Sequence, residues 1–255
     1  MKYFYGKSGN DTISGSNGPD YIQGYGGNDT LYGLAGNDYV MGDNGNDYIS
    51  GGAGNDYLYG EDGNDKIYGG DGSDTIYDGA GKDFIKGGSG NDVFIMSTDP
   101  HHDIVYGQSG DDYFAAAGTG FDYLDGGDGN DTFVLAGSGK VIAEFVGGSG
   151  RQDYQLYVGG NLQPASAEIT IDDYKPGYDT LDIHDAAGRN TDAIINMFDV
   201  NKDHKLTAAD GYAQYRADGT SYHIYVDNQT GKVIGMDLQV KAIVLHLPHS
   251  DGIFF

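Results

Sequence analysis

Hydrophobic positions recur every nine residues over the first part of the chain. From Gly6 to Ile95 the sequence divides into ten consecutive nonapeptides with no change of register, and the eighth position is always apolar. Those ten residues are Ile13, Ile22, Leu31, Val40, Ile49, Leu58, Ile67, Ile76, Ile85 and Phe94. The flanking seventh and ninth positions are mostly Thr, Tyr, Ser and Lys, which is the alternation of a strand with one buried face. Each unit is therefore predicted to be a three-residue strand joined to a six-residue turn.

The turn positions follow equally strict rules. The fourth position is Gly in all ten units, the sixth is Asp in all ten, and the first is Gly except at Asp78. We expect the two glycines to supply positive φ or to relieve crowding, and Asn, at the fifth position in seven units, to occupy the left-handed region. The sixth-position residues are Asp11, Asp20, Asp29, Asp38, Asp47, Asp56, Asp65, Asp74, Asp83 and Asp92.

A lone unit buries one apolar side chain, so the units must stack into a solenoid with a thin core between two facing sheets. Stacking places the sixth-position aspartates in rows at the strand spacing, ~4.8 Å. Carboxylates at that separation repel one another, so we expect cations between them. Oxygen-rich turns of carboxylates and carbonyls suit Ca²⁺.

These units resemble the calcium-binding nonapeptide GGxGxDxUx of RTX (hemolysin-type) proteins. The resemblance implies a mainly β fold, a right-handed parallel β-roll (β-solenoid) in which two units of 18 residues make one coil. It also implies multiple Ca²⁺ ions between neighbouring turns of one edge, held by the aspartates and by backbone carbonyls. Ten units then provide eight inter-turn sites.

Past Ile95 the register slips by two residues around Pro100, and four more units are recognisable at 98–106, 107–115, 117–125 and 126–134. They add the candidate ligands Asp112, Asp122 and Asp131, whereas the weak unit with Asp103 is expected to hold no ion. A bulge and a second short roll are both compatible with the slip. The cluster His101-His102-Asp103 is interpreted as a surface loop in preference to a transition-metal site.

Three regions are thus predicted. They are an N-terminal roll over 1–97, an irregular or second short repeat block over 98–140, and a capping and secretion-signal region over 141–255. Within the last, residues 169–183 resemble the flanking segment that caps the roll in serralysin-like RTX proteins, and Asp173 and Asp179 match its acidic positions. An ordinary hairpin with a Pro-Gly turn is the alternative.

Residues 199–210 resemble an EF-hand or dockerin-type loop. Its candidate ligands are Asp199, Asn201, Asp203, Lys205 (through its carbonyl) and Asp210. Helices are predicted on both sides, so the cap is expected to be small, mixed and β-rich with a helix–loop–helix. His204 in place of Gly and Asp in place of the final Glu indicate weak binding, and a polar helix–loop–helix capped by Asp is the alternative.

The net charge of the chain limits the kinds of partner that it can bind. With 39 acidic against 14 basic residues and a net charge of -25, the surface repels nucleic acid and anionic lipid. The chain has no apolar run long enough for a transmembrane segment and no Cys. We expect no signal peptide, because Met1 to Asp11 lacks an apolar region. The ending Asp251-Gly-Ile-Phe-Phe255 is similar to the C-terminal signal of type I secretion substrates, and a short amphipathic strand is the alternative. We therefore expect a secreted, extracellular protein that leaves the cell through a type I exporter.

Catalytic motifs are missing from the sequence, which contains neither H-E-x-x-H nor G-x-S-x-G. We expect a non-enzymatic binding or structural module. Tyr21, Tyr39 and Tyr57 are predicted to stack on one outer face, with fewer aromatic residues on the opposite sheet; this face is a candidate surface for a polysaccharide or a protein, or a packing ladder covered by residues 141–255. The alternative function is a detached repeat module of a larger RTX enzyme or toxin of the alginate epimerase, protease, lipase or hemolysin type.

Overall fold

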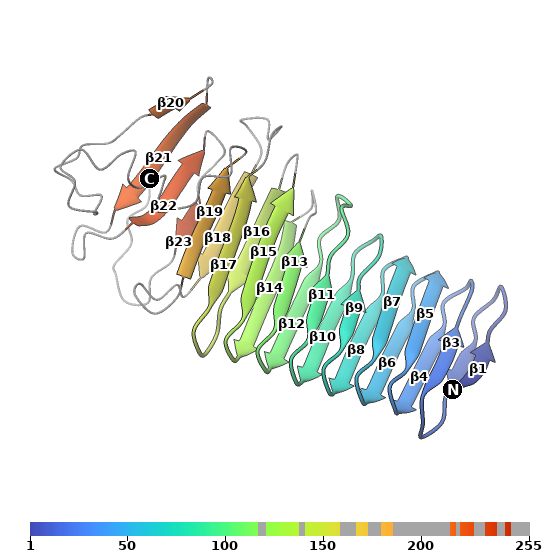
Figure 1. Cartoon of the computed structure of the whole chain (residues 1–255). Coiled ribbons are helices and arrows are strands. Elements are labelled where there is room, and N and C mark those ends of the chain that lie inside the picture. The colour runs from blue at the N-terminus through green and yellow to red at the C-terminus, as the bar shows by residue number, and fades with distance from the viewer. Residues whose placement is uncertain are drawn as a thin grey trace.

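Short strands that alternate between two sides build the fold. A computed structural model describes residues 1–116, 121–137, 141–158, 167–172, 180–185, 215–217, 220–226, 233–238 and 243–245. Among these residues the strands form two ten-stranded parallel sheets and one three-stranded antiparallel sheet. Figure 1 shows the two parallel sheets as a continuous ladder that begins at the N-terminus, with the three-stranded sheet at the far end.

The odd-numbered strands up to β19 make the first sheet. They are, in order, β1 (Lys2–Tyr5), β3 (Asp20–Gln23), β5 (Tyr39–Asn44), β7 (Tyr57–Asp62), β9 (Thr75–Tyr77), β11 (Val93–Ile95), β13 (Tyr113–Ala116), β15 (Thr132–Gly137), β17 (Asp153–Val158) and β19 (Thr180–Asp185). The second sheet contains β2 (Thr12–Ser14), β4 (Thr30–Ala35), β6 (Tyr48–Ala53), β8 (Lys66–Asp71), β10 (Phe84–Ser89), β12 (Ile104–Ser109), β14 (Phe121–Asp128), β16 (Val141–Val146), β18 (Ala167–Asp172) and β23 (Ile243–Leu245).

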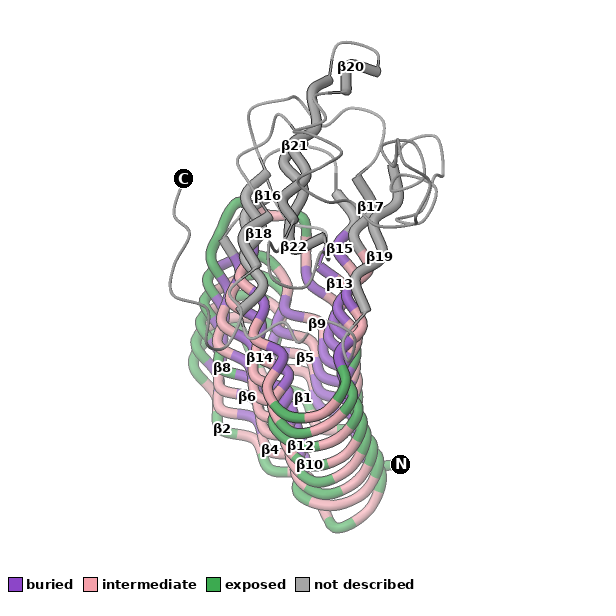
Figure 2. The backbone as a smooth tube through the Cα atoms, turned by 90° about the vertical axis from the view of Figure 1, so that its left-hand side faces the viewer, coloured by how far each residue is buried: buried purple, intermediate pink, exposed green. Residues whose placement is uncertain are grey.

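Strand pairing confirms a coil of two units. In the regular run each residue pairs with the residue 18 positions on, as in Ile49 with Ile67 and Val40 with Leu58. The eighth-position residues from Ile22 to Phe94 are fully buried between the two sheets. Figure 2 shows these buried positions lining the inside of the coil, while the exposed ones gather at the turns. The predicted thin core is confirmed.

The register slip does not interrupt the sheets. β10 pairs with β12 at an offset of 20 residues, Phe84 with Ile104, and β11 pairs with β13 at the same offset, Val93 with Tyr113. The two additional residues are absorbed by the turn between β11 and β12. Of the two readings that the slip left open, an irregular turn within one roll is correct and a second roll is not.

Beyond residue 141 the same two sheets continue without the nonapeptide signature. β14 pairs with β16, β15 with β17, β16 with β18 and β17 with β19, all parallel. Larger rings fill this part of the core: Phe133, Phe145 and Tyr154 are fully buried and lie 5.1 to 6.2 Å apart between ring centroids. The two parallel sheets therefore extend into the region that was predicted as the cap.

The third sheet consists of β20 (Tyr215–Ala217), β21 (Thr220–Val226) and β22 (Val233–Leu238), paired antiparallel. The other C-terminal predictions lie outside the described residues. They are the helix–loop–helix, the candidate ligands Asp173, Asp179, Asp199, Asn201, Asp203, Lys205 and Asp210, and the terminal segment 251–255.

Aromatic ladders run along both outer faces. On the first sheet Tyr3, Tyr21, Tyr39, Tyr57, Tyr59 and Tyr77 are linked by centroid distances of 4.5 to 6.3 Å. On the second sheet Tyr32, Tyr48, Tyr68, Phe84, Tyr106 and Tyr123 are linked at 5.3 to 6.3 Å. The predicted stack of Tyr21, Tyr39 and Tyr57 is present, and the opposite sheet carries a ladder of its own that was not predicted. The second ladder was missed because its rings alternate between the seventh and ninth positions of successive units.

The turn conformation also differs from the expectation in one respect. Positive φ occurs at the fourth position, as in Gly54 (φ 133), and at the second, even where that residue is Tyr25 (φ 75) or Leu34 (φ 81). The fifth-position Asn residues are not left-handed. Their side-chain Oδ1 instead accepts the backbone N–H one coil on, as in Asn64 N–H to Asn46 Oδ1 at 2.8 Å. Asn at this position is explained by that ladder.

Candidate metal sites in the turns

The sixth-position aspartates lie in two rows, one along each edge of the roll. The first row is Asp11, Asp29, Asp47, Asp65, Asp83, Asp103 and Asp122, and the second is Asp20, Asp38, Asp56, Asp74, Asp92, Asp112 and Asp131. After the first aspartate of each row, each Oδ1 accepts the backbone N–H of the aspartate one coil earlier, for example Asp38 N–H to Asp56 Oδ1 at 2.7 Å. Only Asp103 N–H to Asp122 Oδ1 is longer, at 3.3 Å. This contact aligns every carboxylate along its row.

The second oxygen of most of these carboxylates is buried without a partner. Within the part of the chain that the structure describes, Oδ2 receives no hydrogen bond in Asp29, Asp38, Asp47, Asp56, Asp65, Asp74, Asp83, Asp92, Asp112 and Asp131. The residues are at most 2 % exposed. A buried polar atom without a partner carries a desolvation cost, and a buried unpaired charge carries a larger one. Eight of the ten belong to the unbroken run of units, matching the eight expected inter-turn sites.

Glycine at the first turn position opens the space beside each of these oxygens. A Cβ on Gly33 would lie 2.5 Å from Asp38 Oδ2 and 2.5 Å from the carbonyl oxygen of Gly51 in the next coil. The same collision with the carboxylate recurs at Gly24, Gly42, Gly51, Gly60, Gly69, Gly87, Gly107 and Gly126. A carboxylate and a backbone carbonyl thus converge where only glycine leaves room. Oxygen-only ligands of this type suit a hard divalent cation such as Ca²⁺.

Burial makes these carboxylates poor anions on their own. It raises the pKa of Asp56 and of Asp65 to about 7, and the pKa of Asp112 to about 8, from an ordinary value of 3.8. The neighbouring Asp in the row adds a smaller repulsion in each case. The protein groups therefore do not compensate the rows at neutral pH. A divalent cation beside Oδ2 would supply the missing charge.

The rows end on groups that do not need a cation. At the N-terminal end, Asp11 Oδ2 accepts the N–H of Lys7 at 2.6 Å, and Asp20 Oδ2 accepts the N–H and hydroxyl of Ser16 at 2.5 and 2.8 Å. At the other end of the second row the place of an aspartate is taken by Gln152. Its Oε1 accepts the N–H of Asp131 at 2.8 Å.

Gln152 is a neutral terminator that the sequence interpretation missed. Its Nε2 donates to the carbonyls of Ser149 at 2.9 Å and Gly129 at 3.2 Å, so the amide satisfies groups that a carboxylate would repel. The signal was present: Gly147-Gly148-Ser149-Gly150-Arg151-Gln152 follows the turn pattern with Gln at the sixth position. Searching only for Asp at that position hid the unit.

In the wide turn between β11 and β12, the aspartate of the weak unit stays in its row. Asp103, assigned to a weak unit without an ion, is buried in the first row and accepts the N–H of Asp83 at 2.8 Å. His101 Nδ1 lies 3.0 Å from Asp99 Oδ2 and is exposed. Among the described residues, the only three metal-ligating side chains that converge are Asp78, Asp83 and Asp103, so no histidine joins a metal cluster there.

Fold and turns together define a class of protein: a parallel β-solenoid whose stacked turns present oxygen ligands to divalent cations. The family model of the RTX calcium-binding nonapeptide repeat (four copies) matches residues 5–40, 32–67, 41–76, 68–95, 101–118 and 114–137, which together make up half of the chain. The chain belongs to this family, and its repeats imply a calcium-binding module.

No curated protein matched the sequence. Within the described ranges, no helix has the length and hydrophobicity needed to cross a bilayer.

Proposed function

We propose that this chain is a secreted binding module that folds when it meets extracellular Ca²⁺ and has no catalytic activity of its own. The ten buried Oδ2 atoms without a protein partner carry the proposal. Without cations the folded roll must bury these carboxylates unpaired or protonated. With cations the same oxygens become ligands, so binding and folding are one event.

The free energy expected from calcium binding is large enough to control folding. Extracellular calcium modules typically bind at ~10⁻⁴ to 10⁻³ M. At ~1 mM Ca²⁺ each site would contribute about 0.4 to 1.4 kcal/mol by mass action. Eight sites then contribute on the order of 3 to 11 kcal/mol, which is comparable to the whole stability of a domain. At submicromolar Ca²⁺ this contribution vanishes, so the chain would be unfolded in the cytosol and folded outside.

Circular dichroism tests this step on the full chain. In EGTA at pH 7.5 we expect a largely unfolded spectrum, and addition of millimolar CaCl₂ should produce the β-sheet spectrum cooperatively. Mg²⁺ at the same concentration is the control, because Mg²⁺ demands octahedral geometry and gives up water reluctantly. Strand content that is independent of Ca²⁺ would contradict the proposal.

We further propose that the chain leaves the cell through a type I exporter. Two features support it: the ending Asp251-Gly-Ile-Phe-Phe255 is similar to the signal of such substrates, and a chain unfolded at cytosolic Ca²⁺ suits passage through a narrow channel. Co-expression with a type I exporter should place the full-length chain in the medium. Removal of residues 251–255 should retain it in the cell, and equal secretion of both forms would contradict this step.

The proposed ligand surface is the tyrosine ladder of the first sheet. Tyr21 and Tyr39 stack at 5.3 Å with an interplanar angle of 7°, Tyr39 and Tyr57 stack at 6.3 Å, and Tyr57 is 49 % exposed. A flat row of amphipathic rings on a rigid sheet offers both apolar contact and hydroxyl groups, which suits a polysaccharide chain.

A glycan array probed with and without Ca²⁺ identifies the ligand. The double variant Tyr39→Ser/Tyr57→Ser should lose binding and keep its calcium-dependent fold. Tyr48→Ser/Tyr68→Ser on the second sheet is the matched control, because it removes a neighbouring pair of rings, tilted at 34° and 5.3 Å apart, from the opposite face. Equal loss in both variants, or loss of the fold in the first, would indicate that the ladder serves packing alone.

A further inference from the structure

Asp78 is the one first-position residue in the ten regular units that is not glycine. In the neighbouring coils, a Cβ on Gly60 or Gly69 would collide with the carboxylate of the same turn. Asp78 has such a Cβ and is still only 1 % exposed. It follows β9, at the start of the turn that leads to β10, and the turn of the next coil along the same edge is the one widened by two residues. At this one turn of the regular run, a carboxylate therefore stands where the other units have glycine.

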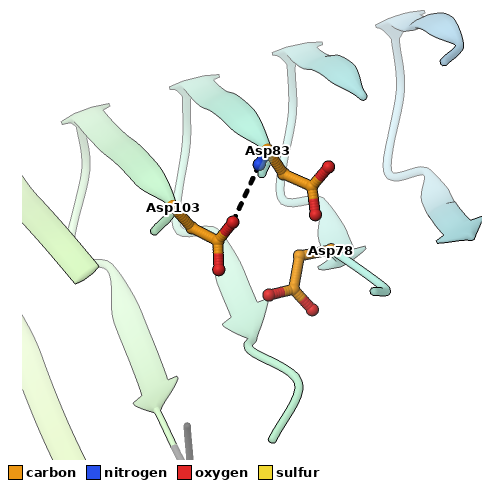
Figure 3. A group of neighbouring side chains, drawn as sticks. All are labelled: Asp78, Asp83 and Asp103. Carbon is orange, nitrogen blue, oxygen red and sulfur yellow. Dashed lines mark hydrogen bonds between the residues drawn. The ribbon is translucent and has the colours of Figure 1, made fainter. Parts of the chain in front are cut away.

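This carboxylate points toward two aspartates of the first row. One oxygen each of Asp78, Asp83 and Asp103 lies within 4.8 Å of the others. Figure 3 shows the three side chains converging from three separate places: the end of β9, the start of β10 and the start of β12. All three residues are at most 4 % exposed.

A second observation points to a ligand at this place. Asp83 Oδ2 is buried and has no hydrogen-bond partner among the described residues. Asp78, in contrast, is fixed by backbone donors: it accepts the N–H of Gly79 at 2.6 Å and that of Ser97 at 2.8 and 3.0 Å. The N–H groups orient Asp78 without neutralising the three charges. A cation beside Asp83 Oδ2 would neutralise them.

We propose that Asp78, Asp83 and Asp103 form a three-carboxylate Ca²⁺ site that binds more tightly than the regular turns and fills first. The inference rests on the proposed calcium-dependent folding and adds the order in which the calcium sites fill. Affinity of oxygen-ligand sites for Ca²⁺ rises with the number of charged ligands. A regular turn offers the aspartates of its row and carbonyls, whereas this site adds a third carboxylate. Its position joins the regular coils to those after the register slip, so the first ion bound connects the two parts of the roll.

Competition of the full chain with a calcium-sensitive chelator dye measures the stepwise dissociation constants. Three variants are compared with the natural chain. Asp78→Asn removes the charge and keeps an oxygen for the Gly79 and Ser97 N–H groups. Asp78→Gly restores the regular repeat residue and should fold at millimolar Ca²⁺. Asp62→Asn is the matched control, because it removes one exposed carboxylate from the preceding coil of the same edge.

In the natural chain we expect a first step on the order of tenfold tighter than in Asp78→Asn or Asp78→Gly, since both lose the third carboxylate. Asp62→Asn should stay within about twofold of the natural chain, because an exposed charge contributes little. If Asp78→Asn keeps the tight step and Asp78→Gly loses it, Asp78 only caps the wide turn and the inference is overturned. An unchanged first constant in both variants also overturns it while leaving calcium-dependent folding intact. Absence of any calcium binding by the natural chain would instead remove the proposed function.

Discussion

The first coil and the interior coils obey the same position rules, yet their aspartates have different surroundings. In the first coil Asp11 and Asp20 receive hydrogen bonds on Oδ2 from Lys7 and Ser16, which occupy the second position of their own turns. In the interior the equivalent oxygen, as in Asp56, receives none. Burial raises the pKa of Asp56 to about 7, whereas at Asp20 the hydrogen bonds from Ser16 outweigh burial and the net pKa is lowered.

The difference originates in the backbone of the turn. Interior turns hold the second and fourth positions at positive φ, as at Gly52 (φ 113) and Gly54 (φ 133). The equivalent residues of the first coil do not have positive φ; they are Lys7, Gly9, Ser16 and Gly18. In this structure the turns of Asp11 and Asp20 stack on a following coil and close on their own carboxylates, while a turn stacked between two coils is held open. The open form exposes Oδ2 to the space beside the first-position glycine. The nonapeptide therefore makes a ligand set only when it is stacked, so the site belongs to the array and not to the single motif.

Acidification is expected to stabilise the metal-free interior coils, and this effect is the largest because the interior carboxylates act together. Without metal, the row aspartates from Asp47 on have pKa values of about 6 to 8 in the folded roll and about 4 when unfolded. Between these values the folded state binds more protons, so metal-free stability is complete below about pH 4 and is lost as the pH rises toward 8.

The measurement is circular dichroism in EGTA from pH 8 to pH 4, where strand content should increase on acidification. With Ca²⁺ present the trend should reverse, because protons displace the ion from the same oxygens. A metal-free chain whose strand content does not change with pH, or decreases on acidification, would show that the interior carboxylates are compensated by the protein itself.

A matched pair of glycine substitutions tests whether stacking sets the turn conformation. Gly54→Ala places a Cβ at φ 133, where it collides with the carbonyl of Gly36, and should cost about 3 kcal/mol of unfolding free energy in Ca²⁺. Gly18→Ala is at the same position of the first coil, with no atom within 4 Å of the added Cβ, and should change stability by less than about 0.5 kcal/mol. Urea unfolding measures both. Equal costs would mean that the first coil has the interior conformation.

A matched pair of aspartate substitutions has the smallest expected effect. Asp56→Asn replaces an interior ligand, and it should remove one ion and lower the stability in ~1 mM Ca²⁺ by about 1 kcal/mol. Asp11→Asn keeps an oxygen for the Lys7 N–H and should lose no ion. Native mass spectrometry counts the ions, and urea unfolding gives the free energy. Loss of an ion from Asp11→Asn would show that the end of the row also binds calcium.

Sequence alone predicted the parts of this molecule that follow from position within a unit. Burial of the eighth position, as at Ile49, the 18-residue coil and the two rows of aspartates needed only the period and the alternation of a strand. The structure places the sixth-position aspartates as that pattern requires, which could be anticipated because identical units in a stack must superimpose.

What the sequence did not predict depends on neighbours outside the unit. The hydrogen bonds on Oδ2 of Asp11 and Asp20 occur at one end of the described stack, and a motif does not record its place in the stack. The place of Asp103 in the row was not predicted because its unit is a poor match, although strand pairing on both sides keeps it there. The coils after residue 141 were missed because Gln152 stands where an aspartate was sought, and because a longer repeat of 21 residues hides the period.

We expect every interior Oδ2 without a partner among the described residues to mark a bound ion. Anomalous diffraction from crystals grown with Ca²⁺ locates such ions. It should show two lines of anomalous peaks beside the Oδ2 atoms of the interior aspartates, with no peak beside Gln152, where the second row ends on an amide. An ordered roll without peaks along these rows would contradict this expectation.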